Sequence, residues 1–94
     1  MKFVGIFQRE IPGEFKPKDS ELRQWNDFQF LDATDPPADG LEELIRFRAD
    51  RKDADRVRVG LVPGQRYEIV INRMGWDRCP IIYRGRIGQS VGVS

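Results

Sequence analysis

Three Arg-x-Arg pairs, at residues 46–48, 56–58 and 84–86, are the side chains of this sequence best suited to binding an anion. Residues two apart on a β-strand point to the same face, so each pair would place two guanidinium groups roughly 7 Å apart. That separation is close to the spacing of phosphates in an extended single strand. Guanidinium groups also form forked bonds with phosphates and stack on bases. The pairs therefore predict a surface that binds a polyanion.

Acidic neighbours leave a second interpretation open, in which the arginines are the solvated face of an ordinary sheet. Dense acids flank the 46–48 pair, which favours neutralisation there, and the two interpretations are balanced for the 56–58 pair. Only Asp77 lies near the 84–86 pair, and Gly85 leaves flat backbone between the two arginines for the close approach of a ligand. The 84–86 pair is therefore the first candidate for binding.

Charge is distributed unevenly along the chain. Residues 1–55 hold nine Lys/Arg and thirteen Asp/Glu, whereas residues 56–94 hold seven arginines and two acids. Such asymmetry fits a polyanion-binding face on a domain whose net charge is only +1. The alternative is that the two halves neutralise each other in the folded domain.

Three aromatic residues, Phe15, Trp25 and Trp76, lie in predicted loops or strand edges beside cations. Aromatic rings interleaved with cations can stack on bases, which contributes ~1–3 kcal/mol per base. The other aromatic residues alternate with polar ones and are expected in the core, Tyr83 included. The candidate nucleic-acid contacts are Arg84, Arg86, Arg58, Arg73, Arg78, Trp76, Trp25, Phe15, Lys16 and Lys18.

Catalytic chemistry has little support in this composition. The chain has no histidine, which removes the commonest general base and metal ligand. The single cysteine, Cys79, excludes an internal disulfide and makes a structural zinc site unlikely to form. No Gly-rich phosphate loop or Ser-centred nucleophile elbow is present. We expect a non-catalytic protein without a metal or cofactor, not associated with membranes, with the cytoplasm as the default location.

The elements that would position these residues are short strands. Residues 2–8 predict a central strand, and residues 9–20, with two prolines, predict a turn and an exposed loop. Phe28 and Phe30 alternate with polar residues and so share one strand face. Residues 33–40, "ATDPPADG", break the chain.

The second half of the chain predicts further strands separated by turns. A strand is favoured at residues 44–50, although a short helical turn could precede it. The other expectations are a solvated loop or hairpin tip at 50–56, strands at 57–64, 65–74 and 81–89, and a turn at 75–80. In the last strand, Ile81, Tyr83 and Ile87 are expected to face the core, with Arg84 and Arg86 opposite.

The sequence therefore predicts a single all-β domain over residues 1–94, with a frayed tail at 90–94 and five to six strands in a small antiparallel barrel. The segments "WNDFQFLD", "LIRFRAD", "LVPGQRYEIVI" and "PIIYRGRI" resemble, in order, an OB-fold, and more narrowly the single-stranded DNA-binding proteins of filamentous phages. That resemblance implies a basic hairpin wing, exposed aromatic contacts and a homodimer. The counterpart of the wing, "GEFKPKDSELRQW", carries three acids.

The alternative fold is a fibronectin III or immunoglobulin-like sandwich, with a mixed α+β fold as a third possibility. "VRVGLVPGQRYEIVI" is similar to the Leu-x-Pro-Gly-x-x-Tyr corner of that family, in which the tyrosine hydroxyl bonds back to the loop. The buried tryptophan of the family is missing before "DPPADG".

We predict that the domain binds single-stranded nucleic acid, DNA rather than RNA, without strong sequence preference. The alternative is a small protein-interaction module, or a phage-type inhibitor that docks on a host protein and uses its charge mosaic for specificity.

Overall fold

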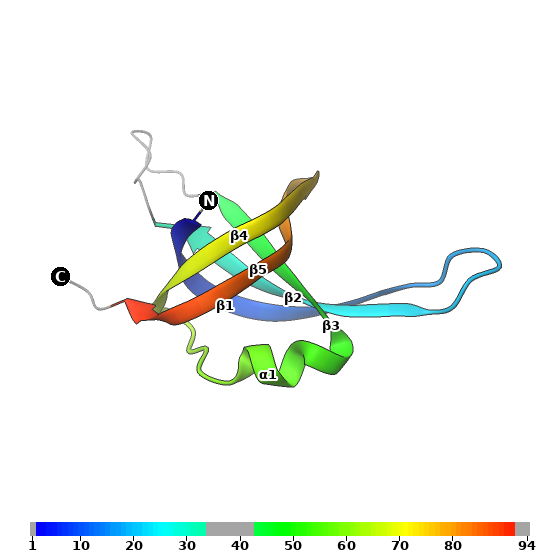
Figure 1. Ribbon diagram of the computed structural model, residues 1–94, viewed down its shortest axis with the longest axis horizontal. Coiled ribbons are helices and arrows are strands. Elements are labelled where there is room, and N and C mark those ends of the chain that lie inside the picture. Colours follow the sequence, from blue (N-terminus) through cyan, green and yellow to red (C-terminus); the bar gives the residue numbers. More distant parts are fainter. Residues whose placement is uncertain (1, 34–42, 92–94) are drawn as a thin grey trace.

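The computed structural model describes residues 2–33 and 43–91, and most of these residues lie in strands that form one sheet. The sheet closes on itself in the order β1-β2-β3-β5-β4 (Figure 1). Neighbouring strands are antiparallel except for β3 and β5, which are parallel. The elements are β1 (Lys2–Phe15), β2 (Arg23–Asp32), β3 (Leu44–Asp50), a 3-10 turn (Arg51–Asp53), α1 (Ala54–Arg58), β4 (Arg66–Asp77) and β5 (Cys79–Val91).

This architecture confirms the all-β class, and the strand predicted at residues 44–50 coincides with β3. A single sheet that closes differs from the two facing sheets of a sandwich. No helix among the residues that the structure describes is long and apolar enough to cross a membrane.

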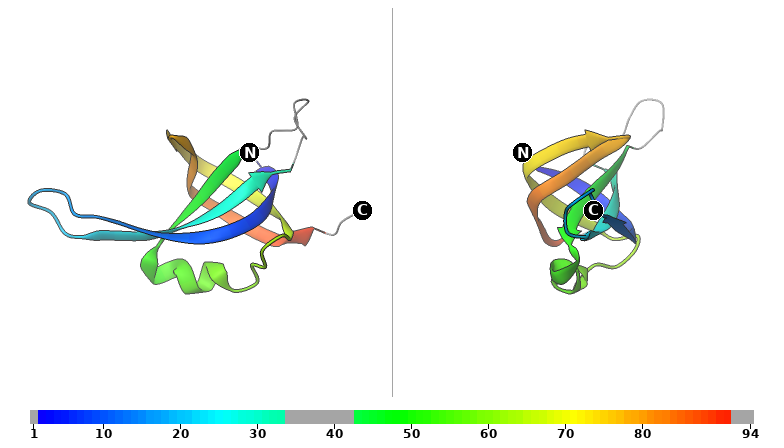
Figure 2. Two further views of the ribbon diagram at one scale, coloured as in Figure 1. Left: turned by 180° about the vertical axis from the view of Figure 1, so that it is seen from behind. Right: turned by 90° about the vertical axis from the view of Figure 1, so that its right-hand side faces the viewer.

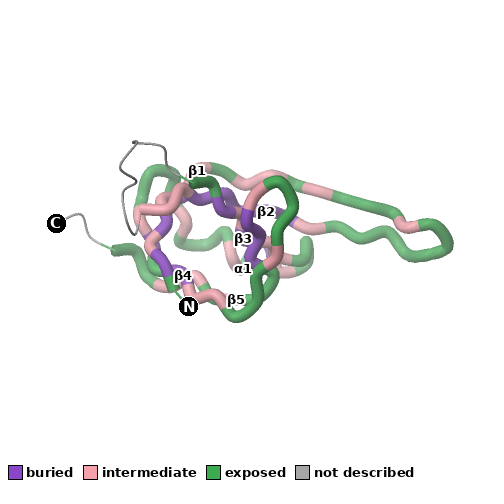
Figure 3. The backbone as a smooth tube through the Cα atoms, turned by 90° about the horizontal axis from the view of Figure 1, so that it is seen from above, coloured by how far each residue is buried: buried purple, intermediate pink, exposed green. Residues whose placement is uncertain are grey.

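The core lies inside the closed sheet, where all five strands contribute one face. Phe28 and Phe30 of β2 are 0 % exposed, so the alternation read from the sequence correctly gave the buried face of this strand. Figure 3 shows the buried segments gathered in the middle of the sheet, away from the projecting hairpin. The other large core side chains are Phe3, Phe7, Ile45, Phe47, Tyr67, Ile69 and Ile82.

The loop predicted at residues 9–20 is wrong in its first half, because β1 continues to Phe15. β1 pairs with β4 only over Lys2–Ile6, and its later residues pair with β2 alone. Proline has no backbone N–H to donate to a neighbouring strand. Pro12, opposite Asn26, can therefore stay in β1, since no described strand pairs with its other edge at this point. The result is a long β1–β2 hairpin that projects from the closed sheet (Figures 1 and 2).

The charged loop at 50–56 and the strand at 57–64 are also wrong, because residues 51–58 form the 3-10 turn and α1 and residues 59–64 form a loop with turns. Ala54 and Val57, three residues apart, pack against the core from one side of the helix. Asp55 lies in the first turn of α1 and Arg58 in its last turn, which suits the helix dipole. Consequently Arg56 and Arg58 do not share a strand face.

Tyr67 fixes the loop that follows α1. Its hydroxyl donates to the carbonyl oxygen of Gly60 at 2.7 Å and accepts from the N–H of Val62, also at 2.7 Å. The corner hydrogen bond expected from the sandwich family is thus present, although the strands form one closed sheet. Gly60 has a φ of +88°, a conformation that glycine adopts without strain.

The turn predicted at 75–80 is shorter than expected, and the strand after it turns different side chains toward the core from those predicted. β4 ends at Asp77, β5 begins at Cys79, and the chain reverses at Arg78, whose φ is 66°. The β4–β5 register shifts between Arg73 and Met74, which places Ile82 in the core and leaves Tyr83 41 % exposed. The core position predicted for Tyr83 is therefore wrong, whereas Ile81 is buried and Ile87 packs against the core.

Two further predictions concern the ends of segments. β5 includes Ser90 and Val91, so the frayed tail does not begin at residue 90, and residues 92–94 lie outside the described part. Of the break predicted at 33–40, residues 34–40 also lie outside it.

Candidate functional site

Six side chains from four neighbouring strands form a continuous cationic and aromatic surface on the outside of the sheet. We call this surface the arginine face, and its parts are linked by ion pairs, ring contacts and strand register. Its residues are Trp25 (β2), Arg46 and Arg48 (β3), Arg73 (β4), and Tyr83 and Arg84 (β5).

Asp27 holds the β3 arginines in place. It is 2 % exposed, and its two carboxylate oxygens accept a forked pair of hydrogen bonds from Arg48, at 2.9 Å from Nε and 3.1 Å from Nη2. Nη1 of Arg46 lies 3.6 Å from the same carboxylate. The hydrogen bond to Asp27 raises the pKa of Arg48. One buried carboxylate therefore fixes two guanidinium groups and neutralises them only in part.

The neutralisation expected for the 46–48 pair is thus partial, and the acid comes from the adjacent strand and not from the flanking sequence. Nε of Arg46 is buried and has no hydrogen-bond partner within the described residues. A buried donor without a partner is uncommon in folded proteins and suits a water or a ligand atom at that position.

Trp25 is a half-buried member of the face. Its indole packs on Gly13, the residue opposite it in β1, where an added Cβ would collide with the ring. The guanidinium of Arg48 lies over the ring, 4.5 Å from its centroid. Trp25 was predicted to stack on bases, and here it already stacks with a cation from the neighbouring strand.

Tyr83 lies at the centre of the face. Its ring covers Gly75 of β4, where an added Cβ would come within 2.5 Å of Cε2. The guanidinium carbons of Arg48 and Arg73 lie 5.7 Å and 6.0 Å from the centroid of its ring. Tyr83 is thus an exposed aromatic ring with a cation on either neighbouring strand, the environment predicted for the loop aromatics.

Arg73 and Arg84 are directly opposite each other on β4 and β5. Neither forms an ion pair with a carboxylate of the described residues. Like charges placed directly opposite on antiparallel strands are destabilising. An anion such as a phosphate, bound between these two guanidinium groups, would relieve their mutual repulsion.

Gly85 has a different role from the one expected. An added Cβ would collide with the carbonyl oxygen of Val70, so glycine is required by the close approach of β4 and not by a ligand. Arg84 and Arg86 flank it and are both exposed.

Arg58, a predicted phosphate contact, is exposed and forms ion pairs with two acids of the protein. Its Nε and Nη2 donate to the two carboxylate oxygens of Glu10, at 2.6 Å and 2.7 Å, and its Nη1 donates to Asp55 at 2.5 Å. The hydrogen bond from Arg58 lowers the pKa of Glu10, although desolvation opposes it. This network ties α1 to β1, so Arg58 lies outside the arginine face.

The remaining predicted contacts lie on two hairpins. Trp76 and Arg78 are at the end of the β4–β5 hairpin, and Trp76 is highly exposed. Phe15, at the end of β1, is exposed, and Lys16 and Lys18 follow it in the β1–β2 connection. Both hairpins leave the closed sheet on the same side of the molecule, as the front view of Figure 1 and the rear view of Figure 2 show. The β1–β2 hairpin extends well beyond the end of the β4–β5 hairpin, so these residues do not form one continuous surface with the arginine face.

Two open hollows adjoin the face and share Arg48, Asp50 and Tyr83. One, of about 710 Å³, extends toward the base of the β1–β2 hairpin and includes Trp25. The other, of about 430 Å³, extends toward α1 and includes Arg84. Within the described ranges, no group of three or more His, Cys, Asp or Glu side chains could hold a metal ion.

Sequence reasoning did not include Arg46, Arg48 or Tyr83 among the contacts. Asp27 could have indicated the position of the two arginines, because an acid within a core strand needs a cation from a neighbouring strand as its partner. Tyr83 gave no such signal, because its orientation depends on the register shift between two strands.

Comparisons with protein-family models, with curated proteins and with solved structures found no match to this chain. The functional argument therefore depends on the geometry described above.

Proposed function

We propose that this chain is an OB-like barrel that binds single-stranded nucleic acid on its arginine face. The strand order, the parallel contact of β3 with β5 and the helix between β3 and β4 support the fold proposal. OB-folds bind oligonucleotides across the face of strands 2 and 3 and through the β1–β2 and β4–β5 loops. The part of the arginine face on β2 and β3 and the two hairpins correspond to these positions, and the rest of the face extends onto β4 and β5.

The observation that carries the proposal is the unneutralised pair of Arg73 and Arg84 beside the exposed ring of Tyr83. Phosphate oxygens would accept hydrogen bonds from both guanidinium groups and remove their mutual repulsion. Arg86 lies two residues beyond Arg84 on β5, roughly 7 Å along the strand, and would extend the cationic row to a further phosphate.

Bases would stack on Tyr83, with Trp25 beside Arg48 and the exposed Trp76 as further ring contacts. Ring stacking requires the faces of the bases, which a duplex keeps covered, so the aromatic residues favour a single strand. Because every base has such a face, we expect little sequence preference. Phe15, Lys16 and Lys18 would contact a longer strand from the tip of the β1–β2 hairpin.

A titration of labelled oligothymidine, roughly 16 nucleotides long, followed by fluorescence anisotropy tests the proposal. Binding measured between about 50 and 200 mM salt should weaken with a log–log slope of roughly −0.7 per phosphate contacted. The double variant Arg73→Ala/Arg84→Ala should reduce the magnitude of that slope by about 1.4. An RNA oligonucleotide of matching sequence shows whether the 2′-hydroxyl matters.

Arg66→Ala is the matched control, since Arg66 begins β4 at the end opposite Arg73 and forms no ion pair within the described residues. It should leave the slope near that of the unmodified protein, and all variants should keep their melting temperatures. Absence of binding at low salt, or equal losses from Arg66→Ala and the double variant, would end the proposal.

A further inference from the structure

One edge of β5 is free of backbone pairing over most of its length. β5 pairs with β3 only through Arg46–Ile81 and Phe47–Ile82. From Tyr83 to Val91, β4 is the only described strand with which β5 has a paired residue. Unpaired N–H and C=O groups along a strand edge are a template for a further strand.

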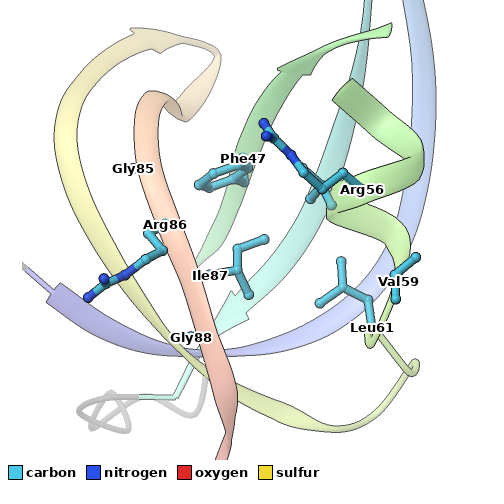
Figure 4. Close-up of a pocket in the computed structure, with 9 residues that line it drawn as sticks. Phe47, Arg56, Val59, Leu61, Gly85, Arg86, Ile87 and Gly88 are labelled. Atoms are coloured by element: carbon cyan, nitrogen blue, oxygen red, sulfur yellow. The ribbon is translucent and has the colours of Figure 1, made fainter. Parts of the chain in front are cut away.

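A groove of about 240 Å³ follows this edge, between β5 and the helix α1 with its following loop, and its lining combines aliphatic side chains with the arginines Arg56 and Arg86. Figure 4 shows Ile87 and Phe47 pointing into it, with Leu61 and Val59 on the opposite side. Val59 is 81 % exposed, so its apolar side chain is accessible to a partner. The groove is continuous with the hollow at Arg84, since both are lined by Phe47, Arg56, Val57 and Gly85.

The two faces of the β5 edge differ in chemistry. The side chain of Ile87 points into the groove, whereas the guanidinium group of Arg86 extends to the other side of β5, although Arg86 also contributes to the lining of the groove (Figure 4). A strand added along the edge would alternate in the same way, with every second side chain in the groove and the others beside Arg84 and Arg86. Apolar residues suit the first set of positions and acidic residues the second.

We infer that the β5 edge binds an extended segment of a partner protein in which apolar and acidic residues alternate. The added strand pairs with the backbone of Tyr83–Val91 and places its apolar side chains against Ile87, Leu61 and Val59. Its acidic side chains lie beside Arg84 and Arg86, which have no ion pair among the described residues. This surface goes beyond the proposed nucleic-acid function and does not depend on it.

Two other occupants fit less well. A second copy paired edge to edge through β5 would place Arg84 and Arg86 near the same arginines of its partner, a repulsive arrangement. Nucleic acid would leave the N–H and C=O groups of the edge unpaired. It would also find no exposed ring for base stacking in the groove, because Phe47, the aromatic residue among the described ones that line it, is buried.

A labelled peptide of alternating Glu and Val, as long as the Tyr83–Val91 edge, is the probe. Anisotropy measures its binding to the full chain, and two-dimensional amide NMR locates it. Controls are a peptide of the same composition with all Glu before all Val, and an alternating Lys and Val peptide. The protein variants are Arg86→Glu and Val59→Glu, both at exposed positions, with Lys18→Glu on the distant hairpin as the matched charge reversal.

We expect the alternating Glu–Val peptide to bind, with shifts and slowed amide exchange along Tyr83–Val91 and in α1. Arg86→Glu and Val59→Glu should each weaken it roughly fivefold or more, and Lys18→Glu should not. No binding, equal binding of the rearranged peptide, or shifts confined to the arginine face would overturn the inference. The inference would also be overturned if oligothymidine, and not the peptide, shifted the amide signals of the groove. If oligothymidine binds nowhere on the protein, only the proposed function is contradicted.

Discussion

Asp27→Asn provides the sharpest test of how the arginine face is held together. The substitution keeps the size of the side chain but removes the single buried charge that faces Arg46 and Arg48. Breaking a buried ion pair by removing one partner costs ~3–5 kcal/mol, because the remaining charge stays buried without compensation. The side chain of Arg48 is still 22 % exposed, so water can partly solvate its guanidinium. We therefore expect the low end of that range, about 3 kcal/mol of the free energy of unfolding.

A loss of that size should lower the melting temperature of a domain of this length by roughly 12–24 °C. Urea unfolding followed by circular dichroism gives the free energy directly. Asp50→Asn is the matched control, because Asp50 is exposed on β3 and has no ion pair within the described residues. It should change stability by less than about 0.5 kcal/mol.

A second measurement separates charge from packing at Asp27. Replacing the pair together, as Asp27→Leu/Arg48→Met, removes both charges and should recover much of the stability lost in Asp27→Asn. If Asp27→Asn unfolds within about 0.5 kcal/mol of the unmodified protein, the forked pair does not hold the face and the reasoning is wrong.

Three further predictions concern other contacts of the described structure. Because Arg58 lowers the pKa of Glu10 below the usual 4.5, the ionised carboxylate stabilises the fold above that pH, and this contribution is lost as the pH falls through the lowered pKa. The difference in urea midpoint between the unmodified protein and Glu10→Gln should thus be present at neutral pH and shrink as the pH falls through the lowered pKa; a constant difference would contradict it. Tyr67→Phe should cost ~1–3 kcal/mol in urea unfolding, since it leaves two backbone groups of the preceding loop without their partner; an unchanged midpoint would show that water replaces the hydroxyl. Gly75→Val should push the ring of Tyr83 out of position and weaken oligothymidine binding at unchanged melting temperature, and unaltered affinity would argue against stacking there.

The core strands could be predicted from the sequence because each one carries its own signal. Alternation gave the buried face of β2, with Phe28 and Phe30, and of β4, with Tyr67 and Ile69. These strands are flanked on both sides over their core segments, so burial follows the pattern of a single strand.

The α1 segment was misread although the sequence held a contrary signal. Val57, Val59 and Leu61 alternate as in a strand, but Ala54 and Val57 also fit one face of a helix. Acids at the start of that segment and arginines at its end match the helix dipole and favour the helix. The two periodicities conflict over so short a segment, and packing against the core decided between them.

Tyr83 and the extension of β1 could not be read from the sequence, because both depend on neighbouring strands. Tyr83 turns outward at a register shift that involves β4 as much as β5. Pro12 indicates a loop unless it is known that β1 has lost its second neighbour at that point. Pairing partners, and not local preference, determine both outcomes.

The distribution of charge across the arginine face predicts how a bound single strand is oriented on it. On the β2–β3 side, Asp27 partly neutralises the arginines and fixes Arg48 over the ring of Trp25. On the β4–β5 side, Arg73 and Arg84 face each other without a carboxylate among the described residues. Phosphates, which bind bare guanidinium groups most strongly, should therefore follow β4 and β5. Bases should then point from β5 toward β3 and β2, so that they stack first on Tyr83 of β5 and then on the Trp25–Arg48 pair.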